Sequence, residues 1–178
     1  MPMTIEYELT ESDIEEFNVQ HHRLSASSKK RRLVTKWVIP LFYAIIGVYF
    51  VKNYKFIWSV VIFVVAIMWL AFYERYYYIR IRKNTHKLLL EGSNAGMLGK
   101  QSLILTEESI KIRDANGESE YKGPFIKRIV KNSKYLYLYI SSIMAVIIPK
   151  NAFSSEAELE EFKERIKKFV VAGKITNS

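Results

Sequence analysis

The sequence predicts a membrane protein of the α+β class, in which a two-helix transmembrane hairpin precedes an antiparallel sheet closed by a C-terminal helix. Two apolar runs of membrane-spanning length are separated by a short polar segment. After Ser102 apolar residues recur at every second position, which is typical of half-buried strands. The last part of the chain has the spacing of an amphipathic helix. The 178 residues are enough for one small domain and a membrane anchor.

The two apolar runs, Leu33–Val51 and Phe56–Tyr73, contain 19 and 18 residues. At ~1.5 Å per residue each is about 27–28 Å long as a helix, close to the ~30 Å of a bilayer's hydrocarbon core. Neither run has the polar stripe of a helix on a soluble core. In one continuous span, Lys52 and Lys55 would each cost roughly 2.5–3.5 kcal/mol at mid-membrane. We therefore interpret the KNYK segment as a turn.

Basic residues flank the two runs on the side away from this turn. By the positive-inside rule they place both termini in the cytoplasm and the turn outside the inner membrane of the cell, in a multi-pass protein. The acidic N-terminus, TIEYELTESDIEEF, does not have the pattern of a signal peptide. The flanking residues are Lys29, Lys30, Arg31, Arg32 and Lys36 before the first run, and Arg75, Arg80, Arg82, Lys83 and Lys87 after the second.

Chemically active residues are missing from the predicted spans. Trp37–Val51 and Phe56–Tyr73 contain no Asp, Glu, Lys, Arg or His, whereas transporters and intramembrane enzymes need such groups. The chain has no cysteine. GSNAGMLGKQS has Asn94 where a phosphate-binding loop needs glycine, and His21, His22 and His86 fit a solvated helix face better than a metal site. We expect an anchor with no catalytic residue, cofactor or metal.

Three parts follow from this organisation. Residues 1–32 are predicted as a cytoplasmic strand (Thr4–Leu9), a helix (ESDIEEFNVQHHRL) and a basic approach to the membrane. Residues 33–92 form the hairpin and a cytoplasmic extension, and residues 93–178 form the C-terminal domain. Ser12 and Glu15 have the spacing of a capping box for the first helix. The sequence leaves open whether the N-terminal strand joins the later sheet.

The segment after the second span fits two structures. ERYYYIRIRKNTHKLLLEG can continue the helix until Gly92, or its YYYIRIR alternation can form a strand. GSNAGMLGK is predicted as a connecting loop. SLILTEESIKIRD then alternates, Asn116-Gly117 favours a hairpin turn, and Gly123-Pro124 predicts a break in the strand that follows.

The end of the chain holds two more strands and a helix. KYLYLYISS places Tyr135, Tyr137 and Tyr139 on one face of a strand, and IMAVIIPK ends at Pro149. In SSEAELEEFKERIKKFVVAGK, Ser155 and Glu158 form a capping box and Gly173 is the expected stop. The apolar stripe of this helix comprises Leu159, Phe162, Ile166, Phe169 and Val170.

The order of these parts resembles the YcxB-like family of small bacterial membrane proteins. The resemblance rests on the IEYELTESD opening, the paired spans, LTEESIKI, and IIPKNAF (Ile147–Phe153) before the last helix. It implies a membrane location and a C-terminal cytoplasmic domain of pleckstrin-homology-like (PH-like) type. It implies no catalytic or ligand-binding residue. Tyr121 departs from the family pattern, where many relatives have tryptophan.

We expect a non-catalytic role in which the anchored domain interacts with anionic lipid or with a protein at the inner membrane surface. The expected lipid contacts are Lys29, Lys30, Arg31, Arg32, Lys36, Arg75, Arg80, Arg82 and Lys83, each worth ~1 kcal/mol near an anionic surface. The expected partner surface comprises Tyr135, Tyr137, Tyr139, Pro149, Lys150 and Phe153. The partners are membrane lipids and either an unidentified protein or a second copy of the chain, with no nucleic acid.

Two alternatives accompany this expectation. The basic residues have a purely topological role if they only fix the orientation of the spans. An immunity or stress-protection protein is the alternative function, and it would act through the spans and the outer turn.

Overall fold

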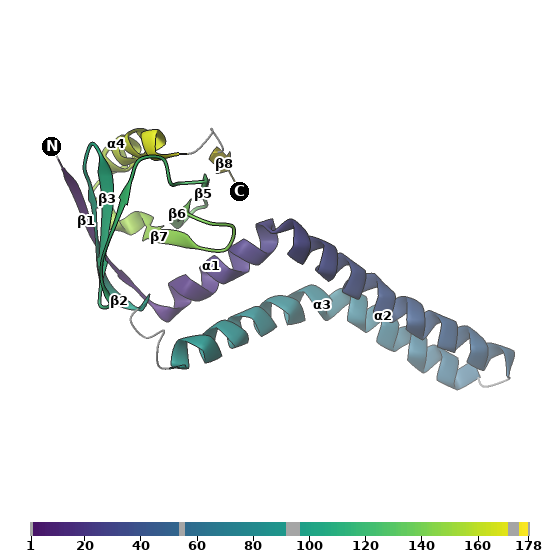
Figure 1. Cartoon of the computed structure of the whole chain (residues 1–178). Coiled ribbons are helices and arrows are strands. Elements are labelled where there is room, and N and C mark those ends of the chain that lie inside the picture. The colour runs from purple at the N-terminus through teal and green to yellow at the C-terminus, as the bar shows by residue number, and fades with distance from the viewer. Residues whose placement is uncertain (1, 54–55, 92–96, 171–174, 178) are drawn as a thin grey trace. The chain divides into compact units, whose positions relative to one another are not determined.

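The computed structural model describes residues 2–53, 56–91, 97–170 and 175–177 (Figure 1). The chain divides into two compact units: residues 1–17 with 87–178, here named the sheet module, and residues 18–86, here named the helical hairpin. Helices α1 (Glu11–Leu24) and α3 (Phe56–Leu90) each begin in one unit and end in the other. The predicted α+β class, with two long apolar helices, antiparallel sheets and a C-terminal helix, is confirmed.

The strands of the sheet module form two sheets of four strands. The first sheet has the order β1-β2-β3-β4, and all its neighbours are antiparallel. The second has the order β7-β6-β5-β8, in which β8 runs parallel to β5. The strands are β1 (Met3–Leu9), β2 (Gly99–Leu105), β3 (Ser109–Asp114), β4 (Gly117–Lys122), β5 (Arg128–Lys131), β6 (Tyr135–Tyr139), β7 (Ala145–Pro149) and β8 (Ile175–Asn177).

The N-terminal strand belongs to the first sheet. β1 pairs with β2 over its whole length, from Met3 opposite Leu105 to Leu9 opposite Gly99 (Figure 1). Alternate residues of β1, Ile5 among them, are buried together with Leu103 and Leu105. Residues 10–98 are therefore an insertion into a β-hairpin. The sequence alone left this pairing undecided.

The predicted turn and strand break are both present. Gly117 has a φ of 140°, a value that non-glycine residues rarely adopt, and it closes the turn opposite Asp114. The backbone N–H of Asn116 donates to Asp114 Oδ1 over 2.8 Å. Strand β4 ends before Gly123, whose φ is 65°. The alternation of residues 102–114 is confirmed as β2 and β3, which are joined by a short turn.

Helix α4 (Glu156–Ile166) is shorter than predicted. Its N-cap is confirmed, because Ser155 Oγ accepts from the backbone N–H of Glu158 over 3.2 Å. A 3-10 turn (Lys167–Phe169, η3) follows, and the Phe169 carbonyl accepts from the backbone N–H groups of Phe125 and Ile126. The chain therefore turns back to the sheet instead of continuing the helix. Gly173, the predicted stop, lies outside the described residues.

The cap of α1 differs from the predicted Ser12–Glu15 box. Thr10 precedes the helix, and Asp13 Oδ2 accepts from both the backbone N–H and the hydroxyl of Thr10, each over 2.7 Å. The sequence offers two polar pairs three residues apart, and the end of β1 at Leu9 selects the earlier pair.

The helical hairpin contains α2 (Ala26–Lys52) and most of α3. Helix α2 continues through Pro40, and α3 remains helical to Leu90, so the alternative strand at YYYIRIR is wrong. Lys52 ends α2 and Asn53 caps it, while Tyr54, Lys55 and the predicted loop residues 92–96 lie outside the described residues. At Gly47 an added Cβ would lie 2.9 Å from Phe63 Cζ, so glycine permits close packing of the two helices.

We expect β1 to be essential for the sheet module, and a shortened chain tests this. Joining Leu9 to Gly99 through an Asn-Gly turn removes the insertion and keeps the last β1–β2 pair. This chain should show a cooperative thermal transition by circular dichroism, although it loses the contacts of α1. Residues 99–178 alone should show no cooperative transition, because Leu103 and Leu105 of β2 lose their contact with β1 and become exposed to solvent. Equal transitions in the two chains would contradict the essential role of β1.

Candidate functional site

The candidate site lies within residues 18–86, at the end of the helical hairpin opposite the Lys52–Asn53 turn. Here α2 and α3 are joined by an ion pair, with Lys36 Nζ 3.1 Å from Glu74 Oε1. Arg32 lies one turn before Lys36, and Tyr78 lies one turn after Glu74. The guanidinium of Arg32 donates to the hydroxyl of Tyr78. The two contacts connect the helices at successive levels.

Two arginines approach the same aromatic ring. Arg23 Cζ, from the last turn of α1, is 5.0 Å from the centroid of the Tyr78 ring. Arg32 Cζ is 5.5 Å from that centroid and 5.8 Å from the centroid of Tyr77. At these distances the negative face of an aromatic ring attracts a cation. Arg23, Arg32, Tyr77 and Tyr78, with His22, are named the arginine–tyrosine cluster below.

His22 completes the cluster without adding charge at neutral pH. Its Nδ1 lies 3.0 Å from Ser28 Oγ and 3.3 Å from the Tyr77 hydroxyl. Burial, followed by the neighbouring His21 and Arg31, lowers the pKa of His22 below the usual value for histidine. A neutral imidazole fits beside two guanidinium groups, because a third cation there would be repelled.

The charge of the helical hairpin is strongly one-sided. Residues 18–86 contain 12 Lys and Arg residues and one acidic residue, Glu74. Glu74 is already paired with Lys36. The cations at this end of the hairpin therefore greatly outnumber the carboxylates of the same unit.

The structure places the nine expected lipid-contact residues at the surface to different degrees. The exposed ones are Lys29, Lys30, Arg31, Arg75, Arg80 and Lys83; Arg32, Lys36 and Arg82 are half-buried. Sequence reasoning missed Arg23 and Tyr78. The YYY run was a visible signal of an aromatic interface, but its pairing with Arg23 depends on how α1 and α3 meet in space.

The expected tyrosine surface of the sheet module requires a correction. Tyr135, Tyr137 and Tyr139 are only 7%, 0% and 1% exposed. Phe17 of α1 packs on Tyr137 and Tyr139, with ring centroids 5.5 and 5.9 Å apart. The alternating leucines of β6 are buried as well, so both faces of this strand are covered. A partner could reach the tyrosines only by displacing α1.

The rest of the expected partner surface is also mostly interior. Pro149 and Phe153 are buried, and Lys150 is half-buried. Lys150 begins a 3-10 turn (Lys150–Ala152, η2), and its backbone N–H donates to the Lys134 carbonyl over 2.8 Å. IIPKNAF therefore mainly positions the chain between β7 and α4.

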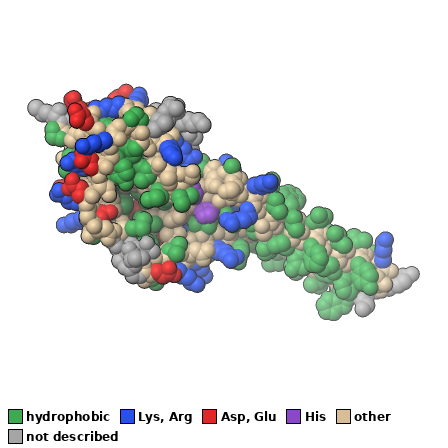
Figure 2. Space-filling model, viewed as in Figure 1, with side chains coloured by type: hydrophobic (Ala, Val, Ile, Leu, Met, Phe, Trp, Pro, Cys, Tyr) green, Lys and Arg blue, Asp and Glu red, His purple; other side chains and the backbone are tan. Residues whose placement is uncertain are grey.

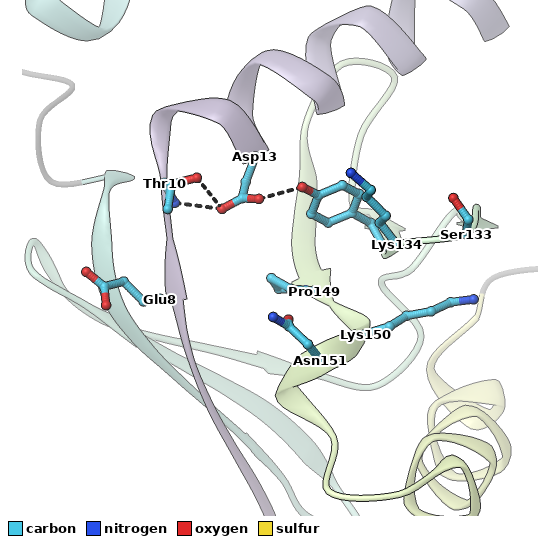
Figure 3. Close-up of a pocket in the computed structure, with 9 residues that line it drawn as sticks. Glu8, Thr10, Asp13, Ser133, Lys134, Pro149, Lys150 and Asn151 are labelled. Atoms are coloured by element: carbon cyan, nitrogen blue, oxygen red, sulfur yellow. Dashed lines mark hydrogen bonds between the residues drawn. The ribbon is translucent and has the colours of Figure 1, made fainter.

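A pocket of about 470 Å³ lies beside this turn, within the sheet module. Figure 3 shows the side chain of Asp13 hydrogen-bonded to Thr10, and the hydroxyl of Tyr135 donates to Asp13 Oδ1 over 2.5 Å. The pocket is lined by Glu8, Thr10, Asp13, Ser133, Lys134, Tyr135, Pro149, Lys150 and Asn151. Its lining carries two carboxylates and two ammonium groups, so it has no strong preference for one sign of charge.

Asp13 is a structural carboxylate in this pocket. Burial raises its pKa, but hydrogen bonds from Tyr135 and Thr10 and the charge of Lys134 lower it further, so the pKa lies below the ordinary value. Burial and the hydrogen bond to Asp13 raise the pKa of Tyr135. Both groups therefore keep one protonation state at neutral pH, and together they attach the start of α1 to β6.

Comparison with known proteins supports the resemblance seen in the sequence. The architecture is that of an α+β protein whose first β-hairpin carries an inserted pair of long apolar helices. Residues 105–164 match the model of the family described as YcxB-like protein, which confirms the resemblance over that segment. The segment runs from the end of β2 into α4. No curated protein and no solved structure matches the chain.

Replacing Asp13 by asparagine should make the sheet module less stable at neutral pH. A carboxylate with a lowered folded pKa stabilises the protein above its unfolded pKa of about 3.9, and this contribution is lost as the pH falls through the folded pKa. We expect Asp13→Asn to cost about 1 kcal/mol at pH 7, the usual size of a cap contribution. The loss should shrink as the pH falls through the folded pKa of Asp13, because the carboxylate is then protonated in the folded chain as well as in the unfolded one.

The measurement is the unfolding of the full chain in detergent, followed by near-ultraviolet circular dichroism of its tyrosines. Glu8→Gln is the matched control, because it removes an exposed carboxylate from the same pocket. It should leave the unfolding curve unchanged. A pH-independent effect of Asp13→Asn would argue against the stabilising carboxylate.

Proposed function

We propose that the chain is a two-span membrane protein. Its helical hairpin crosses the inner membrane, and its PH-like sheet module is held at the cytoplasmic face. The role is non-catalytic: the basic end of the hairpin binds anionic lipid headgroups, and the anchored module presents its surface to a protein partner. The pairing of β1 with β2 is the observation that carries the membrane topology.

This pairing restricts how the insertion can cross a membrane. Leu9 lies opposite Gly99, so the first and last residues of the 10–98 insertion are held at one edge of the sheet. Chain that enters a bilayer from that edge must return to the same side. An even number of spans is required, and the two apolar helices supply it. The requirement for an even number of spans comes from strand pairing and is independent of the distribution of charge.

The surface of the hairpin favours lipid over water. Both helices are long and apolar enough to cross a membrane, and only 11% and 17% of their most apolar windows are buried. Hydrophobic side chains cover the visible face of this part in Figure 2. In this part of the chain Leu41, Phe42, Ile45, Phe56, Ile57 and Ile67 are each more than 60% exposed. A water-soluble protein rarely leaves such a continuous apolar surface uncovered.

The cytoplasmic placement rests on the positive-inside rule. Ten of the twelve cations of residues 18–86 lie at the end opposite the turn, and Lys52 and Lys55 are the other two. The PH-like assignment rests on the family resemblance and on the two sheets followed by a C-terminal helix.

The titratable groups favour a non-catalytic role. A general acid or base works best with a pKa near the operating pH. Among the described residues with shifted values, the pKa values of Asp13, His22, Glu118 and Glu160 are lowered, and those of Tyr7, Tyr135, Tyr137 and Tyr139 are raised. These shifts move each group away from neutrality, as structural hydrogen bonds and burial do.

Single-cysteine labelling tests the topology, because the natural chain contains no cysteine. Asn53→Cys is at the turn, and Ala157→Cys is on the exposed side of α4. In intact cells a membrane-impermeant maleimide should label Asn53→Cys. Ala157→Cys should react only after the membrane is permeabilised. The reverse pattern, or equal labelling of both positions in intact cells, would contradict the proposed placement.

A further inference from the structure

We propose that Arg23 and Arg32, held on Tyr78, form a discrete binding site for the phosphate diester of one anionic phospholipid. This inference rests on the proposed insertion of the helical hairpin. It goes further by assigning lipid recognition to two particular guanidinium groups instead of to the basic surface as a whole. All residues involved belong to residues 18–86.

Under the proposed insertion, the arginine–tyrosine cluster lies at the depth of the lipid headgroups. Exposed apolar side chains begin at Leu33 on α2, directly after Arg32, and the Lys36–Glu74 pair crosses between the helices just inside this point. Four residues separate Lys36 from Arg32 and Glu74 from Tyr78, so the Arg32–Tyr78 contact lies about 6 Å further out along both helices. The polar headgroup layer begins where the hydrocarbon core ends, so the cluster lies at the level of lipid phosphates.

The N–H donors of Arg23 and Arg32 suit a phosphate group. A guanidinium group has five N–H donors in one plane and can bind two phosphate oxygens at once. Arg23 Cζ lies 5.0 Å from the centroid of the Tyr78 ring, and this ring contact needs no hydrogen bond from the guanidinium. Only one N–H of Arg32 is used on the Tyr78 hydroxyl. Arg23 is exposed and Arg32 half-buried, so an approaching headgroup can reach both.

The cations around Arg23 and Arg32 outnumber the carboxylates of residues 18–86. Two guanidinium groups beside one ring repel each other, and the neighbouring residues 29–31 add three more cations. The single carboxylate of the unit, Glu74, is paired with Lys36, and His22 has a pKa lowered by its surroundings. The compensating anion must therefore come from outside these residues. A lipid phosphate at the headgroup level can supply it.

The same balance predicts which headgroup is preferred. A zwitterionic lipid carries an ammonium group beside its phosphate, and that ammonium would meet the surrounding cations, while the one carboxylate of residues 18–86 is already paired with Lys36. A headgroup with net negative charge avoids this repulsion. The site should therefore select phosphatidylglycerol over phosphatidylcholine.

The test is native mass spectrometry of the full chain in detergent, supplied with phosphatidylglycerol, phosphatidylcholine or inorganic phosphate. Salt of about 0.3 M limits diffuse attraction to a Debye length of roughly 6 Å. We expect the natural chain to retain one phosphatidylglycerol. Arg23→Gln/Arg32→Gln should lower that retention about tenfold or more, because two charge-assisted bidentate contacts are lost.

Two further variants separate a discrete site from general basicity. Arg23→Lys/Arg32→Lys keeps the charge but replaces both planar guanidinium groups with ammonium groups. Its retention of phosphatidylglycerol should fall nearly as far as that of the glutamine variant. Lys29→Gln/Lys30→Gln removes two exposed charges whose attraction for anionic lipid is diffuse and screened at this salt, so retention should stay within about twofold of that of the natural chain. A folded state is checked for each variant by its elution volume and helical circular dichroism.

Three results would overturn the site. The first is equal loss in the Lys29/Lys30 and Arg23/Arg32 glutamine variants, and the second is full retention by the lysine variant. The third is equal retention of phosphatidylcholine, or complete displacement of the lipid by millimolar inorganic phosphate. None of these would affect the labelling of Asn53→Cys, so failure of the site and failure of the membrane topology can be told apart.

Discussion

The arrangement of this protein depends on the pairing of β1 with β2. Residues 3–9 and 99–105 form seven opposed pairs, and everything between them leaves and re-enters the sheet at the Leu9–Gly99 end. Under the proposed insertion, strand pairing and membrane topology are coupled. A chain that crossed the bilayer once would leave β1 on the far side and would uncover Leu103 and Leu105 at the edge of the sheet.

The helical hairpin also lowers the cost of this non-local pairing. Closing a flexible loop of the 89 residues in the insertion would cost about 4 kcal/mol in chain entropy, by the logarithmic dependence on loop length. Helices α2 and α3 remove much of that cost, since packing at Gly47 and Phe63 and the Lys36–Glu74 pair bring the ends of the insertion back together. The helical hairpin is thus the connection that makes β1 available to β2.

The parts that could be predicted from sequence are those set by local periodicity. The helices, the alternating strands, the turn at Gly117 and the cap at Ser155 depend on residues a few positions apart. The pairing of β1 and the burial of the tyrosines depend on distant segments. Alternation in β6 separates tyrosines from leucines but does not say what covers each face, and here α1 supplies Phe17 and Asp13. Arg23 could not be predicted for the same reason, because its contact with Tyr78 joins residues far apart in the chain.

The basic residues of the hairpin fall into two groups. The positive-inside rule accounts for the positions of one group and does not account for the positions of Arg23 and Arg32. The positive-inside rule is satisfied by any lysine or arginine near the end of a span, and exposed residues such as Lys29 and Lys30 fit that explanation completely. It does not require two guanidinium groups beside a single ring, where the two cations repel each other. Such an arrangement persists when another interaction compensates its cost. Tyr78 supplies part of that compensation through its ring and hydroxyl, and an anion bound between the two arginines would supply the rest.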